Sequence, residues 1–179
     1  MSNIERMISR EETYHGRAIN LHVDTVDKLD GERTTREVVE HSPCVVVVPL
    51  DEHNNVLLVR QFRYPIGQPL LELPAGGIDD GEQPEDAVRR ELQEEIGYLP
   101  QKIERMGGFY SVPGYGTEYL HCYLARDLVP HQLTAEDTAG IEVITVPLRQ
   151  ISKLIASGEI CDAKSIAALS LLRLQQEKR

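Results

Sequence analysis

The chain has 179 residues, of which 41% are hydrophobic and 27% charged, and a formal net charge of -10 at pH 7. This length and composition are those of an ordinary globular domain that can bury a core without disulfide bonds or zinc. The acidic balance argues against a nucleic-acid partner, because such binding depends on clustered Lys and Arg. A small phosphorylated ligand remains compatible with it if a metal cation lies between carboxylates and phosphates.

The cysteines and the apolar runs point to a cellular compartment. Cys44, Cys122 and Cys161 are odd in number and far apart, so they predict neither a disulfide framework nor a Cys-x-x-Cys site. The longest apolar run, residues 44–50, is too short to cross a bilayer, and the first twelve residues have no apolar core. We therefore expect a cytoplasmic protein without a membrane partner.

An N-terminal antiparallel hairpin is the first predicted element. Apolar and polar residues alternate over residues 18–26, a turn follows at residues 29–32, and a second strand is expected at residues 34–40. We therefore predict an N-terminal β-hairpin extension over residues 1–42 and the main domain over residues 43–179.

The main domain is predicted to interleave strands and helices. Residues 44–50 are typical of a strand buried on both faces, and after a turn at residues 51–55 we expect residues 56–59 to pair back on it. Further strands are expected at residues 70–73, 102–109, 117–124 and 141–146, and helices at residues 148–157 and 163–176. This order predicts an α/β layered domain.

The best-defined element is a helix of about four turns. Pro84 suits its first turn, Val88, Leu92 and Ile96 follow at helical spacing, and Gly97 lies just past its end. The apolar stripe predicts that this helix packs on a sheet.

A second, acidic stripe lies next to the apolar one and consists of Glu91, Glu94 and Glu95. A solvated acidic face is the simplest interpretation of three helical glutamates. Close carboxylates repel one another, however, and oxygen ligands without His or Cys select Mg²⁺ or Mn²⁺. The stripe is therefore a candidate metal site.

The residues around the stripe decide between these interpretations. Gly76 is followed after five residues by Glu82, and after seven more by the run RELQEEIGY that begins at Arg90. This arrangement resembles the Nudix box, the signature of a family of hydrolases that cleave nucleoside diphosphates joined to another group. Tyr98 stands where the family usually has an aliphatic residue, so we expect adjusted packing there.

The resemblance implies a fold, a chemistry and a set of roles. It implies a strand-loop-helix motif in a Nudix-type α/β/α sandwich with a mixed sheet, and metal-dependent hydrolysis. Glu91 and Glu95 would be the principal metal ligands, assisted by Glu94 and Glu82. Arg90 would orient the glutamates through ion pairs, although a plain surface ion pair is the alternative for this residue.

Several segments are similar to the ADP-ribose pyrophosphatase subgroup of the family. One is Pro113, in a Ser-Val-Pro-Gly run, for which a plain turn proline is the alternative. The others are Gly16-Arg17-Ala18, Arg36-Glu37-Val38-Val39-Glu40-His41, Arg60-Gln61-Phe62-Arg63, Glu72-Leu73-Pro74-Ala75-Gly76 and Ile141-Glu142-Val143. In this subgroup the carbonyl group of Ala75 would be a further metal ligand.

The subgroup also implies residues that bind substrate. Arg63 and Arg36 would hold the pyrophosphate or the terminal ribose, since the planar guanidinium group meets phosphate oxygens in pairs. Glu37 of a partner subunit would contact the adenine or its ribose, which implies a homodimer. The alternative for each is a surface charge on a strand.

The resemblance places the general base in an acidic loop, at Asp137 or Glu136, with Glu142 as a third candidate. The chain departs from the subgroup at Ala139, where a second acid is usual. The expected reaction is hydrolysis of ADP-ribose to AMP and ribose 5-phosphate, with Mg²⁺ or Mn²⁺ as the cofactor. The alternatives are GDP-mannose, FAD or another nucleoside diphosphate derivative as substrate, or a non-catalytic nucleotide sensor.

Overall fold

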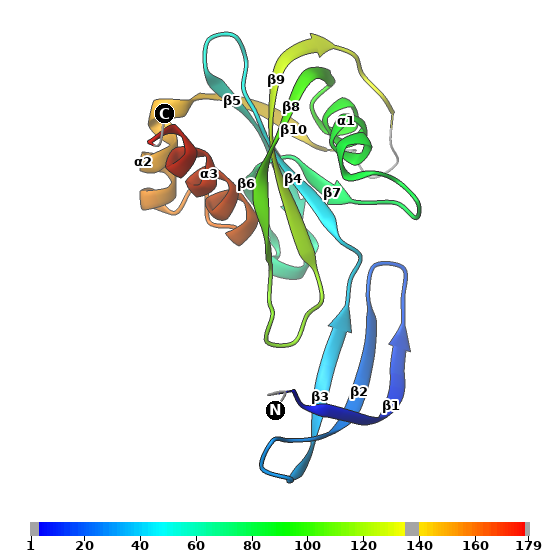
Figure 1. Ribbon diagram of the computed structural model, residues 1–179. Helices are drawn as coiled ribbons and strands as arrows, with labels where there is room; N and C mark the ends of the chain where they lie inside the picture. Colours follow the sequence, from blue (N-terminus) through cyan, green and yellow to red (C-terminus); the bar gives the residue numbers. More distant parts are fainter. Residues whose placement is uncertain (1–3, 135–139, 178–179) are drawn as a thin grey trace. The chain divides into compact units, whose positions relative to one another are not determined.

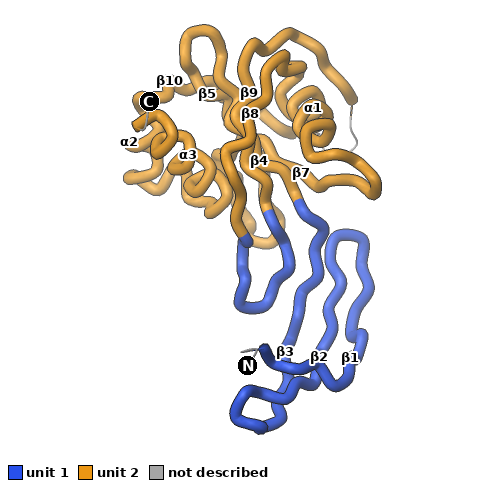
Figure 2. Tube along the Cα trace, in the orientation of Figure 1, with its two compact units in different colours: residues 1–43, 110–119 blue, residues 44–109, 120–179 orange. Residues whose placement is uncertain are grey.

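The computed structural model describes residues 4–134 and 140–177 of the chain (Figure 1). These residues divide into two compact units, shown in different colours in Figure 2. The first unit is Met1–Pro43 with Tyr110–Tyr119, and the second is Cys44–Phe109 with Leu120–Arg179. Within the described ranges, no helix has the length and apolar character needed to span a membrane.

The first unit contains an antiparallel sheet in the order β1-β2-β3, with β1 at Arg6–His15, β2 at Asn20–Asp27 and β3 at Arg33–Glu40. The pairing of β2 with β3 confirms the predicted hairpin. Strand β1 was not expected, because all ten of its side chains are exposed and its sequence lacks the alternation that marks a half-buried strand.

The second unit is built on a mixed four-stranded sheet in the order β7-β4-β9-β8. Strand β4 pairs antiparallel with β7 and parallel with β9. A separate antiparallel sheet has the order β10-β5-β6. The strands are β4 Cys44–Pro49, β5 Asn55–Arg63, β6 Gln68–Glu72, β7 Ala75–Gly77, β8 Tyr98–Tyr110, β9 Tyr119–Pro130 and β10 Glu142–Pro147.

The expectation that residues 56–59 pair back on β4 is wrong. A single bridge joins Leu50, the residue after β4, to Val56, and β5 pairs with β10 and β6. Both edges of β4 are already hydrogen-bonded to β7 and β9, which leaves no edge for β5. The turn itself is present: the Asp51 carboxylate accepts hydrogen bonds from the backbone N–H groups of His53 and Asn55.

Helices cover both faces of the sheets, which confirms the predicted α/β/α arrangement. Helix α1 (Pro84–Glu95) lies on one side, and α2 (Ile151–Ser157) and α3 (Ala163–Gln176) lie on the other (Figure 1). The fully buried strand β4 feeds both cores, because successive side chains point to opposite faces. Val45 and Val47 pack with α1, whereas Val46 and Val48 pack with α3.

Helix α1 begins at Pro84, as predicted, and its 12 residues make slightly more than three turns. The backbone turns away at Gly97, whose φ of 77° lies in the left-handed region that favours glycine. Gln132 then covers the end of the helix, since its side-chain Nε2 donates to the carbonyl groups of Gln93 and Glu94. The helix that carries the glutamates is therefore fixed at its carboxyl end.

Candidate active site

The carboxylate of Glu91 lies against the backbone of β7. Its residue is 8% exposed, and a Cβ atom added to Gly76 would overlap all three atoms of the carboxylate. The neighbouring Gly77 has no heavy atom near its added Cβ. The close approach of the Glu91 side chain therefore requires a glycine at position 76 but not at position 77.

Glu95 lies beside Glu91 and is bound to the same strand. The backbone N–H of Ala75 donates to Glu95 Oε2 over 3.1 Å. Burial, together with the nearby Glu91 charge, raises the pKa of Glu95 to about 8. Burial also raises the pKa of Glu91, although Arg90 partly opposes this. The two carboxylates are thus close together and only partly compensated by cationic groups.

Arg90 connects the remaining glutamates. Its Nε donates to Glu82 Oε1 and its Nη2 to Glu82 Oε2, both over 2.9 Å. Its Nη1 lies 2.6 Å from Glu91 Oε1 and 3.4 Å from Glu94 Oε2. Nη2 also donates to the carbonyl oxygen of Gly77 over 2.8 Å. The guanidinium group holds the pKa of Glu82 below its usual value. One side chain therefore joins the helix, the preceding loop and β7.

The donor set next to β7 suits a hard divalent cation. Glu91 and Glu95 offer carboxylate oxygens, and Ala75, to which Glu95 is bound, offers a backbone carbonyl, all of them ligands that such ions prefer. Among residues 4–134 and 140–177, no three carboxylates bring one oxygen each within 4.8 Å of one another. The predicted stripe is thus divided: Glu94 pairs with Arg90, Glu95 is bound to the strand, and Glu91 does both, because it pairs with Arg90 and lies against Gly76.

Arg63 lies in the same unit and is held by a residue that the sequence analysis assigned no role. Its Nε and Nη2 donate to the carboxylate of Glu72, which is 2% exposed. Lys164 Nζ also donates to Glu72, over 2.7 Å. A glutamate between leucines at positions 71 and 73 was the available signal, whereas Lys164 lies 92 residues away and carried none.

The other candidate substrate-binding residues belong to the first unit. Arg36 is exposed on β3 and donates from Nε and Nη2 to both oxygens of Glu5. Glu37 is exposed on the same strand. Pro113 is the second residue of a turn in which the N–H of Tyr115 donates to the carbonyl oxygen of Val112, which is the position that proline favours.

The candidate general bases fall mostly outside the described residues, since Glu136 and Asp137 both lie in the range 135–139. Glu142 is described: it is exposed on β10, and its Oε2 lies 3.6 Å from Arg60 Nε. The structure therefore gives Glu142 the surroundings of a surface ion pair.

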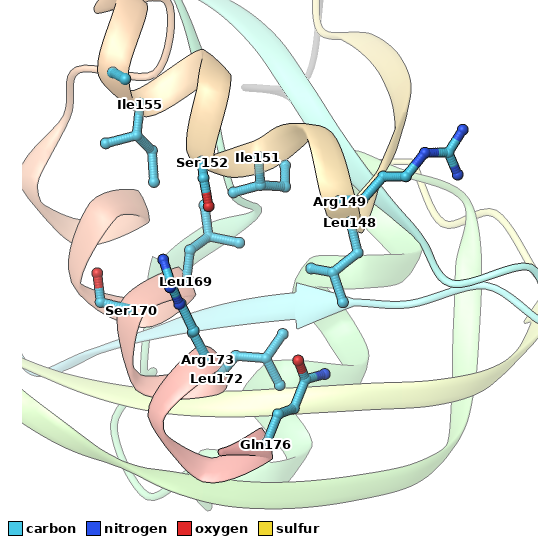
Figure 3. Close-up of a pocket in the computed structure, with 11 residues that line it drawn as sticks. Leu148, Arg149, Ile151, Ser152, Ile155, Leu169, Ser170, Leu172, Arg173 and Gln176 are labelled. Carbon is cyan, nitrogen blue, oxygen red and sulfur yellow. The ribbon is translucent and has the colours of Figure 1, made fainter.

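A cavity of about 540 Å³ lies between α2 and α3 (Figure 3), the two helices on the other side of the sheets from α1 (Figure 1). Ile151, Leu169 and Leu172 are turned toward it, and none of the described residues that line it is an Asp or a Glu. The described lining therefore offers no carboxylate to a cation that would bind phosphates, and it shares no residue with the candidate active site.

Tyr98, which follows the glycine at the end of α1, belongs to the packing on the apolar side of this helix. Its side chain is half-buried and packs against the cluster that contains Val88, Leu92 and Ile96 of the α1 segment. The aromatic ring at this position therefore supports the helix from its apolar side.

Comparison with known proteins identifies the wider family. The model of the NUDIX domain matches residues 40–169. An ADP-ribose pyrophosphatase from Bacillus subtilis is 34% identical over 96% of this chain and 94% of its own length. A methanol dehydrogenase activator from Bacillus methanolicus is 32% identical over the same shares. A GDP-mannose pyrophosphatase from Yersinia enterocolitica is 32% identical over 86% of this chain and 87% of its own length.

A solved structure shows the same fold. It is described as an ADP compounds hydrolase, superposes with a TM-score of 0.89, and covers 97% of this chain and 95% of its own at 21% identity.

The close approach at Gly76 gives a first prediction. Replacing Gly76 by Ala will lower the free energy of unfolding by about 1–3 kcal/mol, because Glu91 or β7 must shift to admit the methyl group. The matched control is Gly77→Ala, which meets open space and should change stability by less than about 0.5 kcal/mol. Urea unfolding of the two variants measures both values. Equal effects at the two positions would contradict the packing of Glu91 against this strand.

Proposed function

The chain belongs to the Nudix family, and we propose that it is a pyrophosphohydrolase that cleaves ADP-ribose to AMP and ribose 5-phosphate with Mg²⁺ or Mn²⁺ bound. The observation that carries the proposal is the pair of carboxylates, Glu91 and Glu95, held against β7. A buried acidic pair is costly to maintain unless a cation offsets its charge. Hydrolysis that depends on a bound cation would explain why the protein keeps these two carboxylates together.

The residues that would hold the cation are Glu91, Glu95 and the carbonyl group of Ala75, with Glu94 and Glu82 assisting. A bound Mg²⁺ or Mn²⁺ polarises phosphoryl oxygens and lowers the pKa of a water molecule. Arg90 keeps three of the glutamates in place through its ion pairs with Glu82, Glu91 and Glu94.

Other residues would bind the substrate and activate water. Arg63 would donate to the diphosphate, for which its planar group is suited. We assign Arg36, Glu37 and Pro113 to the recognition of the terminal groups. Asp137 or Glu136 would accept the proton of the attacking water, with Glu142 as the third candidate.

The substrate assignment is supported by the relatives. The ADP-ribose pyrophosphatase of Bacillus subtilis matches nearly the full length of both chains. The relative named GDP-mannose pyrophosphatase makes that nucleotide sugar the second candidate substrate. The relative named as an activator of methanol dehydrogenase keeps a nucleotide-responsive regulator as the alternative from another class.

A turnover assay tests the function. With Mg²⁺ or Mn²⁺, we expect ADP-ribose to be cleaved with a kcat/KM at least about tenfold above those for GDP-mannose and FAD. Glu95→Gln should lower kcat by more than about a hundredfold, since it removes a ligand of the cation. The matched control is Glu52→Gln, because Glu52 lies in an exposed turn and should leave kcat unchanged. Among Asp137→Asn, Glu136→Gln and Glu142→Gln, we expect the first to lose the most activity.

The possible outcomes separate the candidates. Faster cleavage of GDP-mannose would replace the substrate and keep the chemistry. Binding of ADP-ribose without turnover under either metal would overturn the enzymatic proposal in favour of the regulator. Equal kcat values for Glu95→Gln and Glu52→Gln would remove the assigned metal site.

The raised pKa of Glu95 predicts a pH dependence of metal binding. Because this pKa is about 8 in the metal-free protein, Glu95 is largely protonated at pH 7 and must lose its proton to bind a cation. Mn²⁺ binding should therefore release protons at pH 7 and fewer at pH 9, and its affinity should rise between these values. Calorimetry in two buffers of different ionisation enthalpy measures the release. Equal release at both pH values would contradict the assignment of Glu95.

We also propose that residues 1–42 form an extension that dimerises the protein, while residues 43–179 form the hydrolase domain. The support is the exposure of apolar side chains in and next to β1: Ile4 is 72% exposed, Met7 55% and Tyr14 57%. Such side chains on a charged strand are suited to contact a second copy of the chain. The homodimer would also supply Glu37 across subunits.

The dimer proposal is tested by sedimentation equilibrium. The wild-type protein should sediment as a dimer, and Met7→Glu with Tyr14→Glu should shift it toward the monomer, because charge would then replace apolar contact area. The control is Leu174→Glu, an exposed leucine of α3. A monomeric wild-type protein at micromolar concentration would overturn the proposal.

A further inference from the structure

Glu72 is a buried carboxylate at the end of β6 that binds two cationic side chains. Arg63 Nε lies 3.1 Å from each of its oxygens and Arg63 Nη2 lies 2.5 Å from Oε2. Lys164 Nζ lies 2.7 Å from the same Oε2. Burial alone would raise the pKa of Glu72, but Arg63 and Lys164 together hold it below its usual value. The residue therefore keeps its negative charge inside the protein.

The register of the strands brings Arg63 and Glu72 to one face. Glu72 is opposite Val59, and Arg63 is opposite Gln68. Since side chains alternate along a strand, Arg63 and Val59 share a face of β5. Val59 belongs to the core cluster that packs on α1. The Arg63–Glu72 pair thus lies on the side of the sheet that carries the candidate metal ligands.

One edge of the Arg63 guanidinium group is bound to Glu72, and another edge is available to a ligand. Glu72 takes Nε and Nη2, so Nη1 is not used by this pair. The side chain of Arg63 is 38% exposed, and its charge is close enough to Glu95 for the two to interact. A planar group held on one edge by a buried carboxylate presents its other edge in a fixed direction.

Lys164 and the first turn of α3 keep Glu72 in place. Asp162 caps the helix by accepting from the N–H of Ser165, and it also lies 2.9 Å from Lys164 Nζ. Ser165 Oγ accepts a hydrogen bond from the backbone N–H of Leu73 over 2.7 Å, and both residues are almost fully buried. The helix therefore binds the end of β6 at two adjacent residues.

We propose that Glu72 is a positioning residue for Arg63, which it holds so that Nη1 faces the diphosphate of the bound nucleoside diphosphate sugar. Lys164 offsets the charge of Glu72, so that this carboxylate does not repel the phosphates. The inference rests on the proposed function and deepens it, because it explains why an acidic side chain is buried next to a site for an anionic substrate.

A double-mutant cycle tests the proposal. Glu72→Gln keeps the shape of the side chain and removes the charge, and it should raise the KM for ADP-ribose about tenfold with less than about a threefold change in kcat. Arg63→Ala should raise KM at least as much. Adding Glu72→Gln to Arg63→Ala should then cause no further rise, because Glu72 acts through Arg63. Additive effects of the two changes would overturn the proposal.

Two further variants separate positioning from stability and from charge. Leu172→Ala truncates a buried residue of α3 that lies eight residues beyond Lys164, and it should lower stability while leaving KM unchanged. Arg63→Lys keeps the positive charge but cannot bind Glu72 with two donors, so its KM should resemble that of Arg63→Ala. A KM near the wild-type value for Arg63→Lys, or a raised KM for Leu172→Ala, would contradict the positioning role.

The test also distinguishes failure of the proposed function from failure of the positioning role of Glu72. If the wild-type protein hydrolyses neither ADP-ribose nor GDP-mannose, that function is wrong. The same cycle is then measured on the dissociation constant of α,β-methylene-ADP in the presence of Mn²⁺, a probe with a diphosphate that is not hydrolysed. Non-additive losses of affinity support the role of Glu72, and additive losses or wild-type affinity in Glu72→Gln reject it.

Discussion

The contact of the Glu91 carboxylate with the backbone of Gly76 is the constraint on which the candidate site depends. It requires a residue without a side chain on β7, a helix anchored closely enough to bring the carboxylate there, and a strand that does not move. The first is met by glycine, the second by the apolar stripe of α1 on the core, and the third by the pairing of β7 with β4. The strand, the loop and the helix of the Nudix box therefore depend on one another for their positions.

The site contains carboxylates whose pKa is lowered by cationic side chains and carboxylates whose pKa is raised by burial. Arginine and lysine lower the pKa of Glu82 and Glu72 and so keep these residues ionised. Glu91 and Glu95 have raised pKa values because burial outweighs the cationic groups near them. A cation bound to the pair against β7 would favour the ionised form of both carboxylates.

The sequence was sufficient for features that depend on local pattern. The start of α1, the doubly buried strand β4 and the β2-β3 hairpin follow from spacing and alternation over a few residues. It was not sufficient where the outcome depends on competition between distant segments. The edges of β4 are taken by β7 and β9, which no local pattern shows, and β7 has only three residues. The Glu72–Lys164 pair likewise joins residues 92 positions apart.

The candidate site residues divide in the same way between the two units. The chemistry of the phosphate group is assigned to α1, β7 and Arg63, all in the second unit, where spacing in the box made the residues identifiable. Arg36, Glu37 and Pro113, assigned to the terminal groups, belong to the first unit, in which Arg36 is engaged by Glu5 and Pro113 occupies a turn. A strand and a turn of this kind accept many side chains without loss of fold. The residues assigned to the reaction are thus fixed by packing, whereas the residues that we assign to the choice of substrate are exposed, and packing leaves them free to vary.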